Sequence, residues 1–336
     1  MNGGHKRQLS VIAVLLLGYL ALRVFVFWQH LEQPLALNEP RMLEVGTGST
    51  LTSILGELQA EGILARGYDV LLYARIQGLA GRIKAGEYEL NAGLTARALL
   101  RKLVDGGVTY HQVRILEGWT LREALVELHA QPALVARLDA DDPLALQTAF
   151  GVTEWPEGQF FPDTYNFTRG TTDLQVLQRA QLLMQEVLSS AWATRDAGLP
   201  YATPQEALTM ASIIEKETAV AEEREQIAGV FIRRLQRNMR LQTDPTVIYG
   251  LGTNFDGNLT RAHLESDTPW NTYTRSGLPL TPIALPGRAA VEASLHPDQS
   301  ENLYFVARGD GTHYFSATLE EHNRAVEQYQ SGGGQN

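Results

Sequence analysis

Cysteine is absent from this chain of 336 residues, which excludes disulfide bonds and thiolate metal sites. Histidine is sparse, and His263, His296, His313 and His322 lack the spacing of metal ligands. A basic stripe with interleaved aromatic residues is also missing, and the net charge of −10 argues against nucleic acid as a partner. We therefore expect no metal, no cofactor and no nucleic-acid partner.

Two common catalytic motifs are missing as well. The chain has no Gly-x-Ser-x-Gly sequence, so a serine hydrolase of that type is not indicated. The stretch from Gly46 to Thr50 resembles a phosphate-binding loop but lacks its lysine and its spacing. Without a thiol, the candidate catalytic groups are Ser, Thr, Asp, Glu and Lys.

The N-terminal segment has the composition of a membrane anchor. His5, Lys6 and Arg7 precede an apolar run from Leu9 to Trp28, which is long enough to cross a bilayer. Basic residues on the short leading side predict residues 1–8 in the cytoplasm and the remainder of the chain outside it. The alternative is a cleaved signal peptide, but the run is long for one and no small-x-small cleavage site lies near its end. We expect a retained transmembrane anchor at residues 9–28.

Composition and periodicity divide the remainder of the chain into a linker, two folded parts and a tail. Residues 29–40 are a proline-marked linker, 41–110 a small subdomain, 111–330 a larger domain and 331–336 a flexible tail. The fold class that these patterns predict is α+β, with a mixed α/β larger domain. The expected strands cover residues 42–45, 84–90 and 113–116, and the expected helices cover 50–58, 67–77, 95–103, 174–192, 204–218 and 221–237. The final hundred residues are expected to be mostly short strands and loops.

The helix expected at residues 204–218 places one carboxylate in an apolar setting. Thr203 and Glu206 form a capping box, and Pro204 suits the first helical position. At 3.6 residues per turn, Glu215 falls inside an apolar arc, and Lys216 points the opposite way. The arc consists of Ala207, Leu208, Met210, Ala211 and Ile214.

An apolar setting disfavours ionisation, so Glu215 should keep its proton to a higher pH than an exposed glutamate. That is the preparation that a general acid needs. The alternative is a glutamate at the edge of the core that is paired with Arg224 or Arg233. Glu217 lies at the edge of the arc, and we assign it a positioning or electrostatic role.

Aromatic and amide side chains after this helix suit a carbohydrate cleft, because sugar rings offer an apolar face and hydroxyl groups. Asp244-Pro245 can equally begin a turn. Trp155, Phe160, Phe161 and Tyr165 could extend such a platform or could simply belong to the core. The candidate supporting or substrate-binding residues are Gln242, Thr243, Asp244, Tyr249, Asn271, Thr272 and Tyr273.

Several of these stretches together resemble one family. They are Ser212 to Thr218, Leu241 to Gly250, Asn271 to Thr274, the Gly- and Pro-rich stretch from Gly277 to Gly287, and Glu157 to Tyr165. In this order and with these spacings they resemble the MltG/YceG family of bacterial endolytic murein transglycosylases, over nearly the whole chain after the linker.

The resemblance implies a fold, a reaction and a location. Residues 41–110 would be a LysM-like subdomain that touches peptidoglycan, and Glu215 matches the catalytic glutamate of the family. The substrate would be nascent glycan strands, cut between N-acetylmuramic acid and N-acetylglucosamine to leave 1,6-anhydro-N-acetylmuramic acid ends. Such a lyase would be anchored once in the bacterial inner membrane with its catalytic domain in the periplasm. It would end glycan polymerisation near the membrane-bound peptidoglycan synthases.

Two other functions stay open at this point. One is a peptidoglycan-binding scaffold without enzyme activity. The other is a muramidase with two carboxylates, in which Glu215 works with Asp244 or Glu217.

Overall fold

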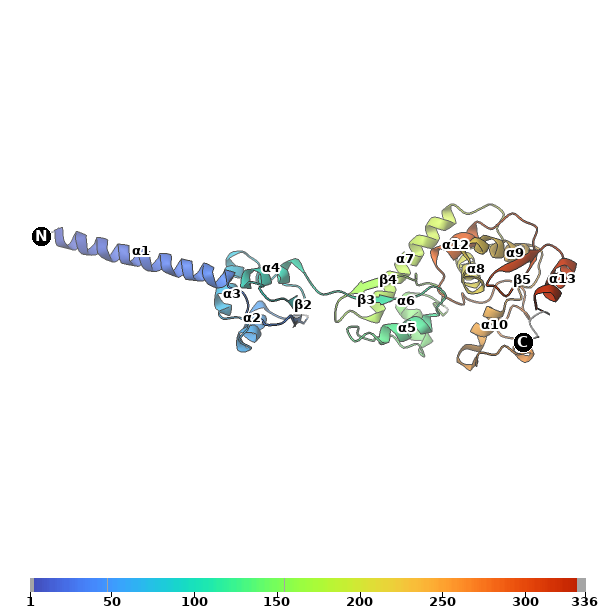
Figure 1. The fold of residues 1–336 in the computed structure, drawn as a ribbon, viewed down its shortest axis with the longest axis horizontal. Coiled ribbons are helices and arrows are strands. Elements are labelled where there is room, and N and C mark those ends of the chain that lie inside the picture. Colours follow the sequence, from blue (N-terminus) through green and yellow to red (C-terminus); the bar gives the residue numbers. More distant parts are fainter. Residues whose placement is uncertain (1–2, 47, 154, 331–336) are drawn as a thin grey trace. The chain divides into compact units, whose positions relative to one another are not determined.

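The computed structural model describes residues 3–46, 48–153 and 155–330, so the predicted flexible tail lies outside the described residues. The chain divides into two compact units (Figure 1). The first comprises Met1–His111 and Thr168–Gly170, and the second comprises Gln112–Phe167 and Thr171–Asn336.

The first unit begins with a long helix, α1 (Gly3–Glu32). Its part Gln8–Glu32 is long and apolar enough to cross a membrane, and none of its most apolar window is buried. This helix is a candidate membrane anchor. Leu31 and Leu35 lie at 0% and 4% exposure in the core of the first unit. The start of the expected linker therefore packs onto this core.

The folded part of the first unit pairs two strands and packs helices against them. Its elements are β1 (Arg41–Val45), α2 (Leu51–Ala60), α3 (Gly67–Ile76), β2 (Gly86–Leu90) and α4 (Ala96–Asp105). β1 and β2 are antiparallel, with Arg41 opposite Leu90 and Val45 opposite Gly86. Thr50 and Thr95 accept hydrogen bonds from backbone N–H groups in the first turns of α2 and α4, as N-caps do. The two predicted strands and three predicted helices of this region are confirmed to within a few residues.

The second unit is mainly helical, with two short two-stranded sheets, β3–β4 and β5–β6. Its first elements are β3 (His111–Arg114), α5 (Leu121–His129), α6 (Pro143–Phe150), β4 (Thr164–Phe167), α7 (Asp173–Ala193), α8 (Pro204–Glu217) and α9 (Arg224–Gln236). The later elements are α10 (Asp244–Leu251), α11 (Arg261–Glu265), α12 (Arg288–Leu295), β5 (Tyr304–Ala307), β6 (His313–Ser316) and α13 (Leu319–Gln330). Short 3₁₀ helices lie at Ala221–Glu223 and Gly252–Asn254.

Helix α8 lies at the centre of the second unit, and the expectation of a single apolar arc was wrong. Every residue from Ala207 to Ile214 is buried, because α7, α9, α10 and α12 all contact this helix (Figure 1). The hydroxyl groups of Thr209 and Ser212 are satisfied by donating to the carbonyls of Gln205 and Thr209. Thr209 and Ser212, on the side opposite the arc, are therefore part of the core, whereas Gln205 and Lys216 at the two ends of that side are exposed.

The expectation for the final hundred residues was incomplete: loops and the short strands β5 and β6 make up most of the described part, but the helices α10, α11, α12 and α13 also lie there. Tertiary contacts select these short helices, and α12 packs directly on α8. Asp244-Pro245 forms the first turn of α10, with Thr243 at the N-cap, and is not a turn between strands.

Candidate active site

The last turn of α8 carries Glu215 and Glu217 to the surface of the second unit. The predicted capping box is confirmed, with Thr203 accepting from the Glu206 N–H and the Glu206 carboxylate accepting from the Thr203 N–H. Glu215 is half-buried, whereas the side chains before it are fully buried. The helix thus ends with a carboxylate at the boundary between core and solvent.

Glu215 is held by a backbone N–H group and forms no ion pair with a cation of the described residues. The N–H of Gly287 donates to Oε2 of Glu215 at 2.9 Å. Arg233, one of the two partners considered from the sequence, pairs with Asp298 at 3.0 Å instead. Arg224 acts on Glu215 only through space, where its charge lowers the pKa of the carboxyl group.

The loop after β3 forms the facing wall. Gly118 N–H donates to the Leu285 carbonyl at 2.9 Å, and Leu285 N–H donates to the Trp119 carbonyl at 2.6 Å. Lys216 Nζ donates to the Gly118 carbonyl at 3.1 Å. These bonds fix Trp119 and its neighbours opposite the end of α8.

A cavity of about 480 Å³ lies between this loop and the end of α8, and we call it the Glu215 cavity. It is lined by Glu117, Gly118, Trp119, Glu123, Glu215, Lys216, Glu217, Thr218, Ala219 and Arg224. Trp119 is the only aromatic residue among them. Its ring can offer a sugar an apolar face.

The aromatic residues that we expected to extend a sugar platform lie elsewhere. Phe160 and Tyr165 are buried in the core formed with α5 and α7, at 0% and 7% exposure. Phe161 packs against the core around α8, and Trp155 donates to the buried Glu157 at 3.2 Å. Their assignment to the core, the alternative left open above, is confirmed for Phe160 and Tyr165.

Burial raises the pKa of Glu215, as the apolar setting predicted. The Gly287 N–H opposes this rise by favouring the carboxylate, and the nearby charge of Glu117 adds to it. Glu117 approaches so closely that a Cβ atom at position 287 would collide with its carboxylate, at 1.9 Å from Oε1. Only glycine at position 287 leaves room for the Glu117 carboxylate beside the backbone N–H that binds Glu215.

Sequence reasoning missed Glu117, Trp119 and Gly287 as parts of the site. Glu117 and Trp119 follow directly after a predicted strand, at a glycine turn, and that position is the signal by which they could have been found. Gly287 offered the weaker signal of a glycine before a short helix.

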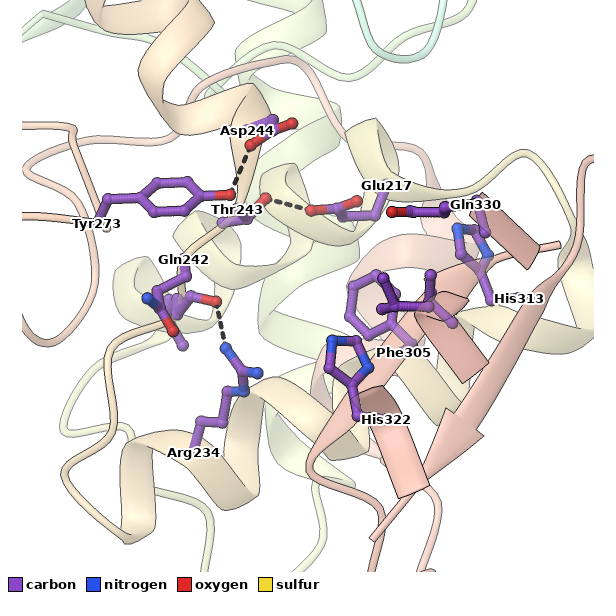
Figure 2. A pocket seen from close by; sticks show the side chains of 14 residues that line it. Glu217, Arg234, Gln242, Thr243, Asp244, Tyr273, Phe305, His313, His322 and Gln330 are labelled. Carbon is purple, nitrogen blue, oxygen red and sulfur yellow. Dashed lines mark hydrogen bonds between the residues drawn. The ribbon is translucent and has the colours of Figure 1, made fainter. Parts of the chain in front are cut away.

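Glu217 lies in the wall between the Glu215 cavity and a second cavity of about 450 Å³. We call the second one the Arg234 cavity; Figure 2 shows its labelled side chains. Thr243 donates its hydroxyl to Glu217. Burial raises the pKa of Glu217 against this hydrogen bond. The Arg234 cavity is lined by Glu217, Arg234, Leu241, Gln242, Thr243, Asp244, Tyr273, Phe305, Val306, Ala307, His313, His322, Val326 and Gln330.

Four of the residues predicted to support or bind substrate line the Arg234 cavity and not the Glu215 cavity. They are Gln242, Thr243, Asp244 and Tyr273. The Tyr273 hydroxyl donates to Oδ1 of Asp244 at 2.6 Å, on the side of the cavity opposite His322 (Figure 2). The backbone of Gln242 has a φ of 54°, a left-handed conformation that is uncommon for residues other than glycine.

Asn271 and Thr272 are each 1% exposed and bind other parts of the chain. The Asn271 amide donates to the Leu264 and Ser266 carbonyls at 3.0 and 2.6 Å and accepts from Tyr273 N–H at 2.8 Å. The Thr272 hydroxyl accepts from Thr243 N–H at 3.1 Å. Both residues thus hold the segment that carries Tyr273.

Tyr249 lines neither cavity and instead reaches a buried carboxylate. Its hydroxyl donates to Oε2 of Glu157 at 2.9 Å, while Leu121 N–H donates to Oε1 at 2.7 Å. Glu157 is 1% exposed, and burial raises its pKa to about 7. The Glu157 carboxylate thus links the start of α5, which follows the Trp119 loop, to α10.

Within the described residues no cluster of three or more His, Asp or Glu side chains is placed to hold a metal ion.

Comparison with known proteins gives consistent matches. The model of the YceG-like family matches residues 43–328. The endolytic murein transglycosylase of Bacillus subtilis (strain 168) is 31% identical over 325 residues, which cover 91% of this chain and 89% of that protein. The endolytic murein transglycosylase of Streptococcus pneumoniae (strain D39) is 29% identical, and the match covers 88% of this chain but 60% of that protein. The crystal structure of a yceG-like protein from Listeria monocytogenes matches with a TM-score of 0.52 and 31% identity, over 85% of this chain and 99% of that one.

Proposed function

Because the chain belongs to the YceG-like family, we propose that it is an endolytic murein transglycosylase. It cuts the bond between N-acetylmuramic acid and N-acetylglucosamine in nascent peptidoglycan strands and leaves 1,6-anhydro-N-acetylmuramic acid ends. The observation that carries this proposal is the half-buried Glu215, with a raised pKa, in a cavity that also holds Trp119.

In the proposed reaction Glu215 acts first as an acid and then as a base. Oε2 accepts the Gly287 N–H, so Oε1 is the oxygen left to carry the proton toward the leaving glycosidic oxygen. The resulting carboxylate then accepts the proton of the sugar's own 6-hydroxyl as that oxygen closes the anhydro ring. The Gly287 N–H stabilises the carboxylate formed between the two steps.

One carboxylate is enough for this reaction because the nucleophile belongs to the substrate. Ordinary glycosidases generally need a second carboxylate to attack the sugar or to activate water. An intramolecular hydroxyl held in the right orientation has an effective concentration on the order of 10⁵ M or more, which favours it over water. Trp119 can hold the sugar ring in that orientation.

The remaining predicted site residues are assigned supporting roles. Glu217 and Thr243 form the wall between the two cavities, and Gln242, Asp244 and Tyr273 face the second one. Asn271, Thr272 and Tyr249 hold the segments on which these residues lie.

The location and partners belong to the same proposal. Helix α1 is inserted once in the inner membrane, with the basic residues before it in the cytoplasm and both folded units in the periplasm. The strand–helix–helix–strand part at 41–110 is LysM-like and contacts peptidoglycan. Cleavage beside the membrane-bound synthases would end the polymerisation of glycan strands.

The test is mass spectrometry of the products released from uncrosslinked glycan strands by the full chain in detergent micelles. Glu215→Gln should abolish anhydro products, a loss of about 10³-fold or more, because removal of a general acid and base costs 10²–10⁴-fold. Glu186→Gln, on the exposed surface of α7, is the matched control and should cleave as the wild type does. Near-normal cleavage by Glu215→Gln would refute its role, and binding to sacculi without any cleavage would support the scaffold.

A further inference from the structure

The Arg234 cavity contains a cation that no carboxylate group of the described residues pairs with. Arg234 Nε donates to the Leu303 carbonyl at 2.7 Å, and Nη1 donates to the Leu241 carbonyl at 2.9 Å. These neutral partners fix the plane of the guanidinium group, which points into the cavity (Figure 2), without neutralising its charge. A fixed and unneutralised guanidinium is suited to a carboxylate ligand.

The neighbouring His322 offers a polar atom without a partner. Its Nδ1 is buried and has no hydrogen bond to any described residue, while its ring stacks on Tyr304 with 5.2 Å between the ring centroids. Buried polar atoms in folded proteins nearly always have a hydrogen-bond partner, so we infer that a bound ligand supplies the partner of His322 Nδ1. Burial and the charge of Arg234 lower the pKa of His322, which favours the neutral ring, and a neutral imidazole donates from one nitrogen.

The opposite side of the cavity offers acceptors. Glu217 binds Thr243 through Oε1, and Asp244 binds Tyr273 through Oδ1. The second oxygen of each carboxylate is available to N–H or ammonium groups. The cavity therefore has a donor side at Arg234 and His322 and an acceptor side at Glu217 and Asp244 (Figure 2).

We propose that the Arg234 cavity binds the stem peptide of the murein strand whose glycan occupies the Glu215 cavity, with a peptide carboxylate at Arg234 and His322. This inference rests on the proposed function. N-acetylglucosamine carries no charge, and the acid group of N-acetylmuramic acid is bound in an amide wherever a stem peptide is attached. The glycan of such a strand therefore has no charge to set against the arginine and the carboxylates of this cavity, whereas a peptide stem presents carboxylates, amides and amines. Glu217 lines both cavities, so the glycan and the peptide of one substrate can occupy them together.

The test compares two substrates and three variants, all with the full chain in detergent micelles. The substrates are uncrosslinked strands that bear stem peptides, and the same strands after an amidase has removed the peptides and the carboxylates so exposed on N-acetylmuramic acid have been converted to amides. His322→Phe keeps an aromatic ring against Tyr304 and removes the unpartnered nitrogen, so it should not reduce stability. Arg234→Lys keeps the charge but loses the fixed fork. The control is His296→Phe, which removes a half-exposed hydrogen bond with Asp196 outside both cavities.

The readout is the ratio of kcat/KM for peptide-bearing strands to kcat/KM for peptide-free strands. We expect a ratio of about 10 or more for the wild type, because one charged hydrogen bond is worth a factor of that size. His322→Phe and Arg234→Lys should each lower the ratio roughly 5–10-fold, and His296→Phe should keep the wild-type ratio. A wild-type ratio near one, or variants that slow both substrates equally as a sugar-binding cavity would, overturns the inference.

A binding measurement separates this inference from the proposed reaction. The probe is the stem peptide that the amidase released, titrated into the full chain and followed by NMR. Binding to the wild type but not to the two cavity variants supports the inference even if neither strand is cleaved, which would refute the proposed function alone. Cleavage of both strands without peptide binding would refute the inference alone.

Discussion

The two cavities at the end of α8 share Glu217 but offer different walls. The Glu215 cavity has four glutamates and one tryptophan around a helix end, and its two cations are Lys216 and Arg224. The Arg234 cavity has an arginine and two histidines facing two carboxylates. The first suits a neutral sugar beside a protonated carboxyl group, and the second suits a charged ligand.

Under the two proposals above, the Glu215 cavity carries out the reaction and the Arg234 cavity recognises the peptide of the substrate. Glu215 is half-buried and is fixed by one backbone N–H, so its proton is held by burial and by the charge of Glu117. In the Arg234 cavity, hydrogen bonds to two backbone carbonyls fix the guanidinium group, and these neutral partners do not compensate its charge. Substitutions in the first cavity should therefore change turnover and its pH dependence, whereas those in the second should change substrate preference.

The largest effect short of losing Glu215 itself is expected for Gly287→Ala. The new Cβ would displace the carboxylate of Glu117, which lies within 1.9 Å of it, and would disturb the N–H that holds Glu215. A misplacement of about 1 Å can cost on the order of 10²-fold in rate, so kcat should fall by about that factor. The stability should change little, since the colliding atoms are the end of a flexible side chain.

The matched control for Gly287→Ala is Gly56→Ala on α2, where a Cβ meets nothing within 4 Å. That variant should keep its kcat and gain roughly 0.5–1 kcal/mol in stability. Equal activity of Gly287→Ala and the wild type would show that the close packing of Glu117 and Glu215 against Gly287 has no catalytic importance.

A smaller effect, confined to the pH profile, is expected for Glu117→Gln. The negative charge of Glu117 raises the pKa of Glu215, so its removal should lower that pKa. Because the proposed acid must be protonated, activity is lost as pH rises through the folded-state pKa, and this loss should begin at lower pH in the variant. The measurement is kcat/KM as a function of pH.

Glu123→Gln is the matched control for this shift. Glu123 lines the same cavity, but its carboxylate accepts from the Thr120 N–H at 2.7 Å in the capping box of α5. It should reduce the stability of α5 and leave the pH profile of activity in place. A profile that is unmoved in Glu117→Gln, or moved equally in both variants, contradicts the assigned role of Glu117.

The smallest effect on activity is expected for the buried Glu157, whose titration acts on stability and not on the reaction. Its folded-state pKa of about 7 lies above the ordinary value of 4.5, so its stability contribution is complete below the ordinary value and is lost as pH rises toward 7. The wild type should thus lose roughly 3 kcal/mol of unfolding free energy over this range that Glu157→Gln does not lose. Urea unfolding at several pH values, followed by tryptophan fluorescence, measures this difference. Parallel pH dependences of the two proteins would show that Glu157 does not titrate in this range.

The sequence predicts the site where local chemistry decides the structure. The capping box at Thr203 and the period of 3.6 residues were enough to place α8 and to set Glu215 apart. The strands and helices of the first unit follow from equally local patterns. The rise in the pKa of Glu215 also follows, because it comes mainly from burial that the periodicity implies.

The parts that the sequence does not predict depend on contacts between distant residues. Gly287 is 72 positions from Glu215, and Gly118 is 98 positions from Lys216, so no local pattern relates them. Phe160 and Trp119 are both aromatic residues near a glycine, yet only packing decides that the first is buried and the second lines the cavity. The helix α12 is short and gains its stability from α8, which propensity alone does not reveal.

Glu215 is proposed to act alone, with the substrate's own hydroxyl as the nucleophile. The most direct test is to let the full chain cleave uncrosslinked strands in water enriched in heavy oxygen and to weigh the new ends by mass spectrometry. We expect 1,6-anhydro ends that carry no label. Reducing ends that carry the label would contradict it, because they would require water as the nucleophile and a second carboxylate to activate it.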